Sequence, residues 1–258
     1  MDNDIYEELE LKEIKREKKK RKKKHYFVKF LIFLVVVAGL GCFSASSFFT
    51  IETITIEGNS YYTDDEVITM ADAKTGGNLF WGAGTSSIKK RLSSDPYFEE
   101  VKVKRKLPNE LSIVVTERKQ VAAIVYADEY VVIDQSGMVL RKSTVDPKVT
   151  LLTGLTISKL EVGSQIEVEE KETLNTTLDM LSAMTDGDIF FKKIDVSNVV
   201  IKAYFLDNLL VKGTPKQVDR VIKSGDLKKV VNNLLENDTT RGTISIGDAN
   251  YMSFSPDF

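Results

Sequence analysis

The pattern of apolar and polar positions changes abruptly near the start of the chain. Residues 1–29 are mostly charged, and the next 20 residues, 30–49, carry no charge and are predominantly apolar. At roughly 1.5 Å rise per residue, a helix of this length matches the hydrocarbon core of a bilayer. The pattern predicts one membrane-spanning helix, within residues 26–49, ahead of a longer segment of mixed strand and helix patterns.

A first unit is expected over residues 50–119, with the element order β-α-α-β-β. The expected elements are a strand at 51–57, a helix starting near Thr63, a helix capped by 85–87, and strands at 97–106 and 111–117. Thr63 and Glu66 have the spacing of a capping box, in which a hydroxyl and a carboxylate satisfy free backbone N–H groups at a helix start. The triplet Leu79-Phe80-Trp81 is interpreted as a core plug beneath the two helices, with a partner anchor at Trp81 as the alternative.

A second unit, a mixed β domain with two helices, is expected over residues 120–258. Its predicted elements are strands at 121–126, 130–134, 138–140, 194–196, 199–205 and 209–213, helical stripes at 174–184 and 218–235, and a terminal hairpin at 242–246 and 251–254. Thr214 and Pro215 mark the start of the second helix. Gly225 interrupts its apolar stripe. The chain is therefore predicted to be α+β behind a single N-terminal transmembrane helix.

Charge orients the predicted membrane helix. An unbroken basic run precedes it, consisting of Lys18, Lys19, Lys20, Arg21, Lys22, Lys23 and Lys24. No basic residue follows the apolar run until Lys74. The positive-inside rule then makes residues 1–25 a cytoplasmic basic tail and places residues 50–258 outside. Anionic lipid attracts such a run by about 1 kcal/mol per basic residue near the surface, so it needs no nucleic-acid partner.

Two other interpretations of the apolar segment compete with that of a retained membrane anchor. Ser44-Ala45-Ser46 offers the small residues of a signal-peptidase site, and Cys42 offers a lipoprotein site. A charged lead of 29 residues and an apolar core of 20 are both long for a removable signal. Three places before Cys42, where lipoprotein sites carry an aliphatic residue, this sequence has Gly39. A retained membrane helix is the favoured interpretation.

Composition removes most catalytic chemistry. The chain has one Cys, Cys42, and one His, His25, which excludes an intramolecular disulfide, a Cys/His zinc cage and a Ser-His-Asp or Cys-His centre beyond residue 49. The acidic pairs Asp64-Asp65 and Asp186/Asp188 fall in a predicted helix cap and a turn, which disfavours a membrane-tethered wall hydrolase. We expect no enzyme activity, no cofactor, no metal and no small-molecule substrate.

Several segments in order resemble one protein family. They are 54–59 (ITIEGN), 77–80 (GNLF), 96–98 (PYF), 101–105 (VKVKR), 108–113 (PNELSI) and 115–118 (VTER). Together they resemble the POTRA domain of the bacterial FtsQ/DivIB cell-division proteins. Tyr130, Val131, Asp134 and Gly137 are similar to an aromatic-V-x-x-D-x-x-G pattern at the start of that family's second, β domain.

The resemblance implies a non-enzymatic scaffold of the bacterial divisome, the protein assembly that builds the division septum. It implies a single-pass cell-membrane protein, N-terminus inside and C-terminal domain outside, enriched at the septum. Implied partners are the membrane and the small FtsL-like and FtsB/DivIC-like coiled-coil proteins. The alternative is a POTRA-type assembly or chaperone component of a secretion system, but such proteins carry a β-barrel whose alternating ten-residue strands this sequence lacks.

The resemblance also suggests where partners bind. In the family the last strands lie at a sheet edge, where unpaired N–H and C=O groups accept an added strand. The candidate partner-binding residues are Ile244, Ile246, Tyr251, Ser253, Phe254 and Trp81. Apolar residues of a terminal hairpin also commonly belong to the core, and this alternative stays open for the side chains of Ile246, Tyr251 and Phe254.

Overall fold

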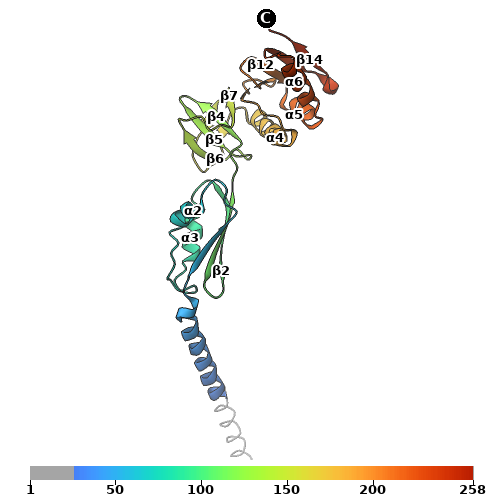
Figure 1. Ribbon diagram of the computed structural model, residues 1–258. Coiled ribbons are helices and arrows are strands. Elements are labelled where there is room, and N and C mark those ends of the chain that lie inside the picture. Colours follow the sequence, from blue (N-terminus) through green and yellow to red (C-terminus); the bar gives the residue numbers. More distant parts are fainter. Residues whose placement is uncertain (1–25, 258) are drawn as a thin grey trace, which may run out of the picture.

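The computed structural model describes residues 26–257 (Figure 1). An N-terminal helix is followed by a three-stranded sheet and then by a nine-stranded sheet. Figure 1 shows these parts following one another along an elongated molecule, with the N-terminal helix at one end and the C-terminus at the other.

The N-terminal helix, Tyr26–Ser44, is long and apolar enough to cross a membrane. It ends five residues before the predicted end of the apolar segment, and a short 3₁₀ helix, η1 (Ser47–Phe49), follows. Ser44 Oγ donates to the carbonyl of Gly41 at 2.8 Å, the kind of local serine bond that competes with helix continuation. Phe49 is buried against the following sheet, so the end of the predicted segment belongs structurally to the first folded unit.

The first unit has the predicted β-α-α-β-β order. Its elements are β1 (Thr53–Glu57), α2 (Asp64–Ala71), α3 (Thr85–Leu92), β2 (Phe98–Lys106) and β3 (Glu110–Glu117). The sheet order is β1-β3-β2, with β1 parallel to β3 and β2 antiparallel to it. This arrangement places the start of β1 and the β2–β3 turn at the same end of the sheet, since Thr53 lies opposite Glu110.

The first helix of this unit begins as its capping box predicts. The Thr63 hydroxyl accepts from the Glu66 N–H, and the Glu66 carboxylate accepts from the Thr63 N–H at 2.9 Å. The second helix differs in detail, because Gly84, in the left-handed region at φ 55°, occupies the capping position. The three hydroxyl residues 85–87 therefore lie in the first turn of α3 and do not cap it.

The second unit contains most of the strands. Its elements are β4 (Ala122–Tyr126), β5 (Glu129–Ile133), β6 (Val139–Ser143), β7 (Thr150–Thr153), β8 (Ile157–Lys159), β9 (Glu167–Val168), α4 (Lys171–Gly187), β10 (Lys193–Asp195), β11 (Ile201–Tyr204), β12 (Leu209–Gly213), α5 (Pro215–Lys223), α6 (Asp226–Glu236), β13 (Gly242–Ile246), η2 (Asp248–Asn250) and β14 (Met252–Ser255). The long sheet has the order β14-β13-β12-β11-β10-β7-β4-β5-β6. Two parallel pairings, β4 with β7 and β7 with β10, join its two halves.

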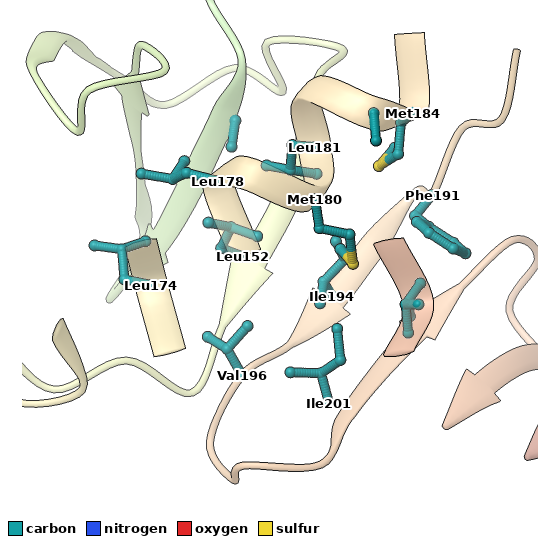
Figure 2. Close-up of a cluster of buried hydrophobic side chains, with 14 of the residues drawn as sticks. Leu152, Leu174, Leu178, Met180, Leu181, Met184, Phe191, Ile194, Val196 and Ile201 are labelled. Atoms are coloured by element: carbon teal, nitrogen blue, oxygen red, sulfur yellow. The ribbon is translucent and has the colours of Figure 1, made fainter. Parts of the chain in front are cut away.

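Helix α4 supplies the core that unites those halves. Figure 2 shows Leu178 and Leu181 of α4 facing Leu152 of β7, while Met180 lies near Ile194 of β10. All five side chains are buried in one continuous hydrophobic cluster that extends as far as Ile244 on β13. The apolar stripe predicted for residues 174–184 is therefore the central contact face of the second unit.

The second predicted helix divides in two. Thr214 caps α5 through a capping box with Gln217, and Pro215 occupies the first helical turn, as the sequence predicts. Gly225 adopts the left-handed conformation at φ 73° and begins α6. Because glycine has no Cβ, it accepts this conformation with little strain. The apolar stripe is thus carried by two helices, with Val218, Val221 and Leu227 all buried.

Candidate protein-interaction surfaces

Strand β14 forms one edge of the nine-stranded sheet. It pairs antiparallel with β13, with Ser253 opposite Ser245 and Phe254 opposite Ile244. Strand β13 is paired on both sides, with β12 and with β14, so its backbone is occupied. Of the two strands in the terminal hairpin, β14 alone has a backbone edge available to another strand.

The register decides which backbone groups of β14 are free. The N–H of Gly247 donates to the carbonyl of Tyr251 at 2.8 Å, and these residues lie opposite one another at the mouth of the hairpin. Hydrogen-bonded and non-hydrogen-bonded pairs alternate along an antiparallel ladder. Ser253 therefore bonds inward to Ser245, whereas Met252 and Phe254 direct their N–H and C=O groups toward the free edge. The residues that would accept an added strand are Met252 and Phe254.

The candidate side chains of the hairpin separate into two groups. Ile244 and Ile246 are both buried, so neither offers its side chain to a partner, and for Ile246 this is the core alternative left open by the sequence. The reason is that β13 directs both side chains into the cluster beneath α5 and α4. Phe254 packs partly against the same cluster, while Tyr251 is 70% exposed and Ser253 is exposed. A partner approaching the edge would contact the side chains of Tyr251 and Ser253.

A close contact holds β14 in place. A Cβ added to Gly242 would lie 2.6 Å from the ring of Phe254 and 2.7 Å from the carbonyl oxygen of Ser255. Gly242 also has φ 135°, a conformation that side-chain-bearing residues rarely adopt. The first residue of β13 must therefore be glycine for the Phe254 ring to cover the sheet.

The interpretation of Trp81 as a core residue is wrong. Within the triplet only Leu79 is fully buried, whereas Trp81 is 73% exposed. A tight loop turns the indole outward, because the Asn78 side-chain oxygen accepts the N–H groups of Phe80 at 3.0 Å and Trp81 at 3.2 Å. The indole N–H donates to Ser44 Oγ at 3.1 Å, which places Trp81 beside the end of the N-terminal helix.

Side-chain bonds join the two folded units. Arg118 donates from Nη1 to Oδ2 of Asp134 at 2.8 Å, and Arg141 donates from Nε to the Tyr97 hydroxyl at 3.1 Å. Burial is the main cause that raises the pKa of the Tyr97 phenol well above its ordinary value. Sequence reasoning missed this junction, although Arg118 and Asp134 both belong to the segments that carry the family resemblance.

Asp134 explains the recurrent pattern around it. Its Oδ1 accepts the N–H groups of Ser136 and Met138, each at 2.8 Å, and so forms the turn between β5 and β6. Gly137 in that turn has φ 78°. The Asp and Gly of the aromatic-V-x-x-D-x-x-G pattern are therefore needed for a turn, and the second carboxylate oxygen is left for Arg118 of the other unit.

The acidic residues considered as catalytic candidates occupy structural positions. Asp64 accepts a hydrogen bond from the Asn59 amide at 2.8 Å, and Asp65 lies in the first turn of α2. Asp186 lies in the last turn of α4, and Asp188 follows it as the C-cap, paired with Lys228 at 2.8 Å. The bond from Lys228 lowers the pKa of Asp188. Across residues 26–257 no three His, Cys, Asp or Glu side chains are grouped to hold a metal ion.

The basic run Lys18, Lys19, Lys20, Arg21, Lys22, Lys23 and Lys24 lies outside the described residues. Its assignment to the membrane surface remains a prediction from charge and from its position immediately before the helix.

Comparison with known proteins identifies relatives over most of the chain. Residues 49–118 match the family described as POTRA domain, FtsQ-type. The chain is 29% identical over 176 residues to the cell division protein DivIB of Clostridium acetobutylicum, covering 66% of this chain and 70% of that protein. It is also 29% identical over 214 residues to DivIB of Clostridium botulinum strain Hall, covering 78% and 83% respectively.

Similarity extends beyond the clostridia. The cell division protein DivIB of Bacillus subtilis is 23% identical over 167 residues, covering 64% of this chain and 61% of the relative. The cell division protein FtsQ of Syntrophotalea carbinolica is 27% identical over 173 residues, covering 64% and 59%. The matches are to proteins of both names and reach well past the POTRA segment.

Proposed function

Because the chain belongs to the FtsQ/DivIB family and so has a role in cell division, we propose that it is a non-enzymatic membrane scaffold of the bacterial divisome. In this role it would link and stabilise septal cell-division proteins through its extracytoplasmic units. The observation that carries the proposal is the free edge of β14, whose unpaired backbone groups suit the addition of a partner strand.

The proposed organisation is a cytoplasmic tail over 1–25, a membrane helix within 26–49, a POTRA-like domain over 50–119 and a β domain over 120–258. The N-terminus is inside and the C-terminal domain outside, because the basic run precedes the helix. A protein that crosses the cell membrane once in this orientation would present both folded units on the outer face of that membrane, where we expect septal proteins to assemble.

The proposed partners are FtsL-like and FtsB/DivIC-like coiled-coil proteins. A segment of such a partner would add as a strand along β14, where Met252 and Phe254 direct their backbone groups outward. Strand addition takes affinity from main-chain hydrogen bonds and specificity from neighbouring side chains, here Tyr251 and Ser253.

A non-enzymatic role is supported by what the carboxylates already do. A cleft lies beside the junction of the two folded units, and its lining includes Glu117 and Asp134. Glu117 Oε2 accepts the N–H of Ser60 at 2.7 Å, and Asp134 forms the β5–β6 turn described above. Carboxylates that hold backbone groups in this way are poorly placed to act as a general acid and base pair.

The proposal is tested in dividing cells that express the protein with a fluorescent domain fused to its N-terminus. We expect bands at midcell that depend on residues 50–258. Protease added to wall-stripped cells should degrade those residues and spare the N-terminal tag. A uniform membrane signal would contradict the septal role, and protection of the C-terminal domain would contradict the topology.

A further inference from the structure

A group of apolar side chains is exposed around the outer end of the N-terminal helix. Phe48 is 61% exposed, and Phe80 and Trp81 extend outward from the loop between α2 and α3. Leu107, in the β2–β3 turn, is 65% exposed. We call the four residues Phe48, Phe80, Trp81 and Leu107 the membrane-proximal face.

Aromatic contacts couple this face to the helix. The ring of Phe49, which is itself buried, makes edge-to-face contacts with Phe43 at 5.2 Å, Phe48 at 5.1 Å and Phe80 at 5.0 Å between centroids. Phe43 belongs to the last turn of the helix and Phe80 to the folded unit. The two parts are therefore packed together and do not merely follow one another along the chain.

Polar bonds fix the same junction. The Asn78 side-chain amide donates to the carbonyl of Ser44 at 2.9 Å, satisfying a carbonyl at the end of the helix. The N–H of Leu79 donates to the carbonyl of Phe49 at 2.7 Å, and the Trp81 indole donates to Ser44 Oγ. These bonds hold the loop of Phe80 and Trp81 beside the helix end.

The β2–β3 turn reaches the same end of the first unit. The N–H of Glu52, just after the η1 segment, donates to the carbonyl of Asn109 at 2.9 Å. Figure 1 shows the turn after β2 on the side of the unit from which the N-terminal helix leaves. Leu107 thus lies on the side of the first unit that faces the helix, as Trp81 does.

Charge at this end fits an anionic surface. Arg105, near the turn, donates from Nε to the carbonyl of Leu79 at 2.7 Å, which leaves the rest of its guanidinium beside the loop. Lys106 is paired with Glu57 and Glu110, and the Glu52 carboxylate is held by the Asn109 amide at 2.6 Å. The acidic groups nearest the turn are thus already bonded within the protein, while Arg105 keeps donors for a phosphate.

The length of the helix sets the depth of this face. The 19 residues Tyr26–Ser44 span about 28 Å at roughly 1.5 Å per residue, close to the thickness of the hydrocarbon core. Ser44 then lies at the boundary between lipid chains and headgroups. Tryptophan and other aromatic side chains are favoured at that level, because the ring is apolar and the indole N–H is polar.

We propose that the membrane-proximal face seats in the headgroup layer of the outer leaflet and fixes the orientation of the POTRA-like unit on the membrane. The ligand is the lipid surface itself, with Arg105 facing lipid phosphate. This inference rests on the proposed membrane anchoring of the chain. Its consequence is that the β14 edge is presented at a defined distance from the membrane, where a partner anchored in the same bilayer can reach it.

Trp81 is the only tryptophan of the chain, so its fluorescence reports on this face directly. The full chain is reconstituted into vesicles of phosphatidylcholine and phosphatidylglycerol that carry a quencher either near the headgroup or deep in the acyl chain. We expect stronger loss of Trp81 emission with the shallow quencher than with the deep one, and weak quenching by acrylamide in the buffer. Leu107→Glu should raise acrylamide quenching and shift the emission to longer wavelength.

Val199→Glu is the matched control, because Val199 is 72% exposed and lies between β10 and β11 of the second unit. It introduces the same charge and should leave Trp81 quenching unchanged. Strong acrylamide quenching in the wild type, or shielding of Trp81 only after a protein partner is added, would overturn the inference. Flotation of the vesicles after an alkaline wash distinguishes the proposed membrane anchoring from the proposed seating of the membrane-proximal face. A chain that is washed off the vesicles contradicts membrane anchoring. A chain that floats with the vesicles while Trp81 is unshielded from acrylamide contradicts the seating alone.

Discussion

Arg118 and Asp134, which belong to different folded units, form an ion pair at 2.8 Å in which the Asp134 side chain is only 7% exposed. The Arg118 side chain is 19% exposed, so water screens this pair less than it screens a surface pair. Asp134 also forms the β5–β6 turn, and one carboxylate therefore contributes both to a local structure and to the joint between the POTRA-like unit and the β domain.

The joint should loosen when Arg118 is removed. Arg118→Ala leaves Asp134 without its charged partner, and we expect a loss of about 2 kcal/mol in the free energy that holds the two units together. Small-angle scattering of residues 50–258 should show a broader range of inter-unit distances. Asp134→Ala should be more damaging, because it also removes the bonds to the Ser136 and Met138 N–H groups. Equal effects of the two changes would contradict the double role of Asp134.

The register of β14 predicts which proline blocks a partner strand. Met252→Pro removes an N–H that faces the free edge, so the parent sheet keeps its bonds while strand addition loses one. Ser253→Pro removes an N–H that bonds to Ser245, so it should destabilise β14 itself. We expect Met252→Pro to weaken binding of a coiled-coil partner's extracytoplasmic segment in calorimetry, with the circular dichroism spectrum unchanged.

Met252→Ala is the control for the lost side chain, since it keeps the N–H, and it should bind nearly as well as the wild type. Full affinity in a folded Met252→Pro variant would place the partner on another surface.

Gly242 and Gly225 give a matched pair of glycine tests. Both have positive φ, but a Cβ at Gly242 would meet the Phe254 ring, whereas nothing lies within 4 Å of a Cβ at Gly225. Gly225→Ala should cost about 1 kcal/mol from backbone strain alone. Gly242→Ala should cost more and displace β14, which urea denaturation and loss of partner binding would reveal. Similar costs at the two positions would argue against the packing of Phe254 on Gly242.

The capping box of α2 predicts a dependence on pH. Bonds from the backbone and the hydroxyl of Thr63 lower the pKa of Glu66 below its ordinary value of 4.5. A carboxyl with a lowered folded-state pKa contributes stability that is present above its unfolded-state pKa and lost as pH falls through the folded-state value. Glu66→Gln keeps both bonds of the box without titrating, so it should lessen the fall in thermal stability below about pH 4.5. If the thermal stability of the variant fell below this pH as steeply as that of the wild type, the role of Glu66 would be contradicted.

Local signals in the sequence predicted many elements correctly, because a few neighbouring residues determine them. Thr63 with Glu66 and Thr214 with Pro215 start helices at the predicted places, since a cap needs only residues within one turn. Leu174, Leu178, Leu181 and Met184 lie on the buried face of α4 as predicted, because the spacing of apolar residues along a helix shows which of its faces packs on the core. The interpretation of Trp81 as a core residue failed because neighbouring residues do not determine its burial. Nothing in the sequence around the buried Leu79 indicates whether the loop directs the Trp81 side chain inward or outward.

The apolar helix, the β-α-α-β-β order and the terminal hairpin could all be predicted from consecutive residues, because runs of charge and hydrophobic periodicity are local features of the chain. The register of β14 could not be predicted in this way. The Ser253 backbone bonds inward and the Met252 backbone faces the free edge, but a shift of one residue in strand register would exchange the two and leave the sequence pattern unchanged. Packing of the elements in space also brings Arg118 to Asp134, which are 16 residues apart in the chain, and Trp81 to Ser44, which are 37 residues apart. Such contacts depend on how separate elements pack in space, which no short stretch of sequence specifies.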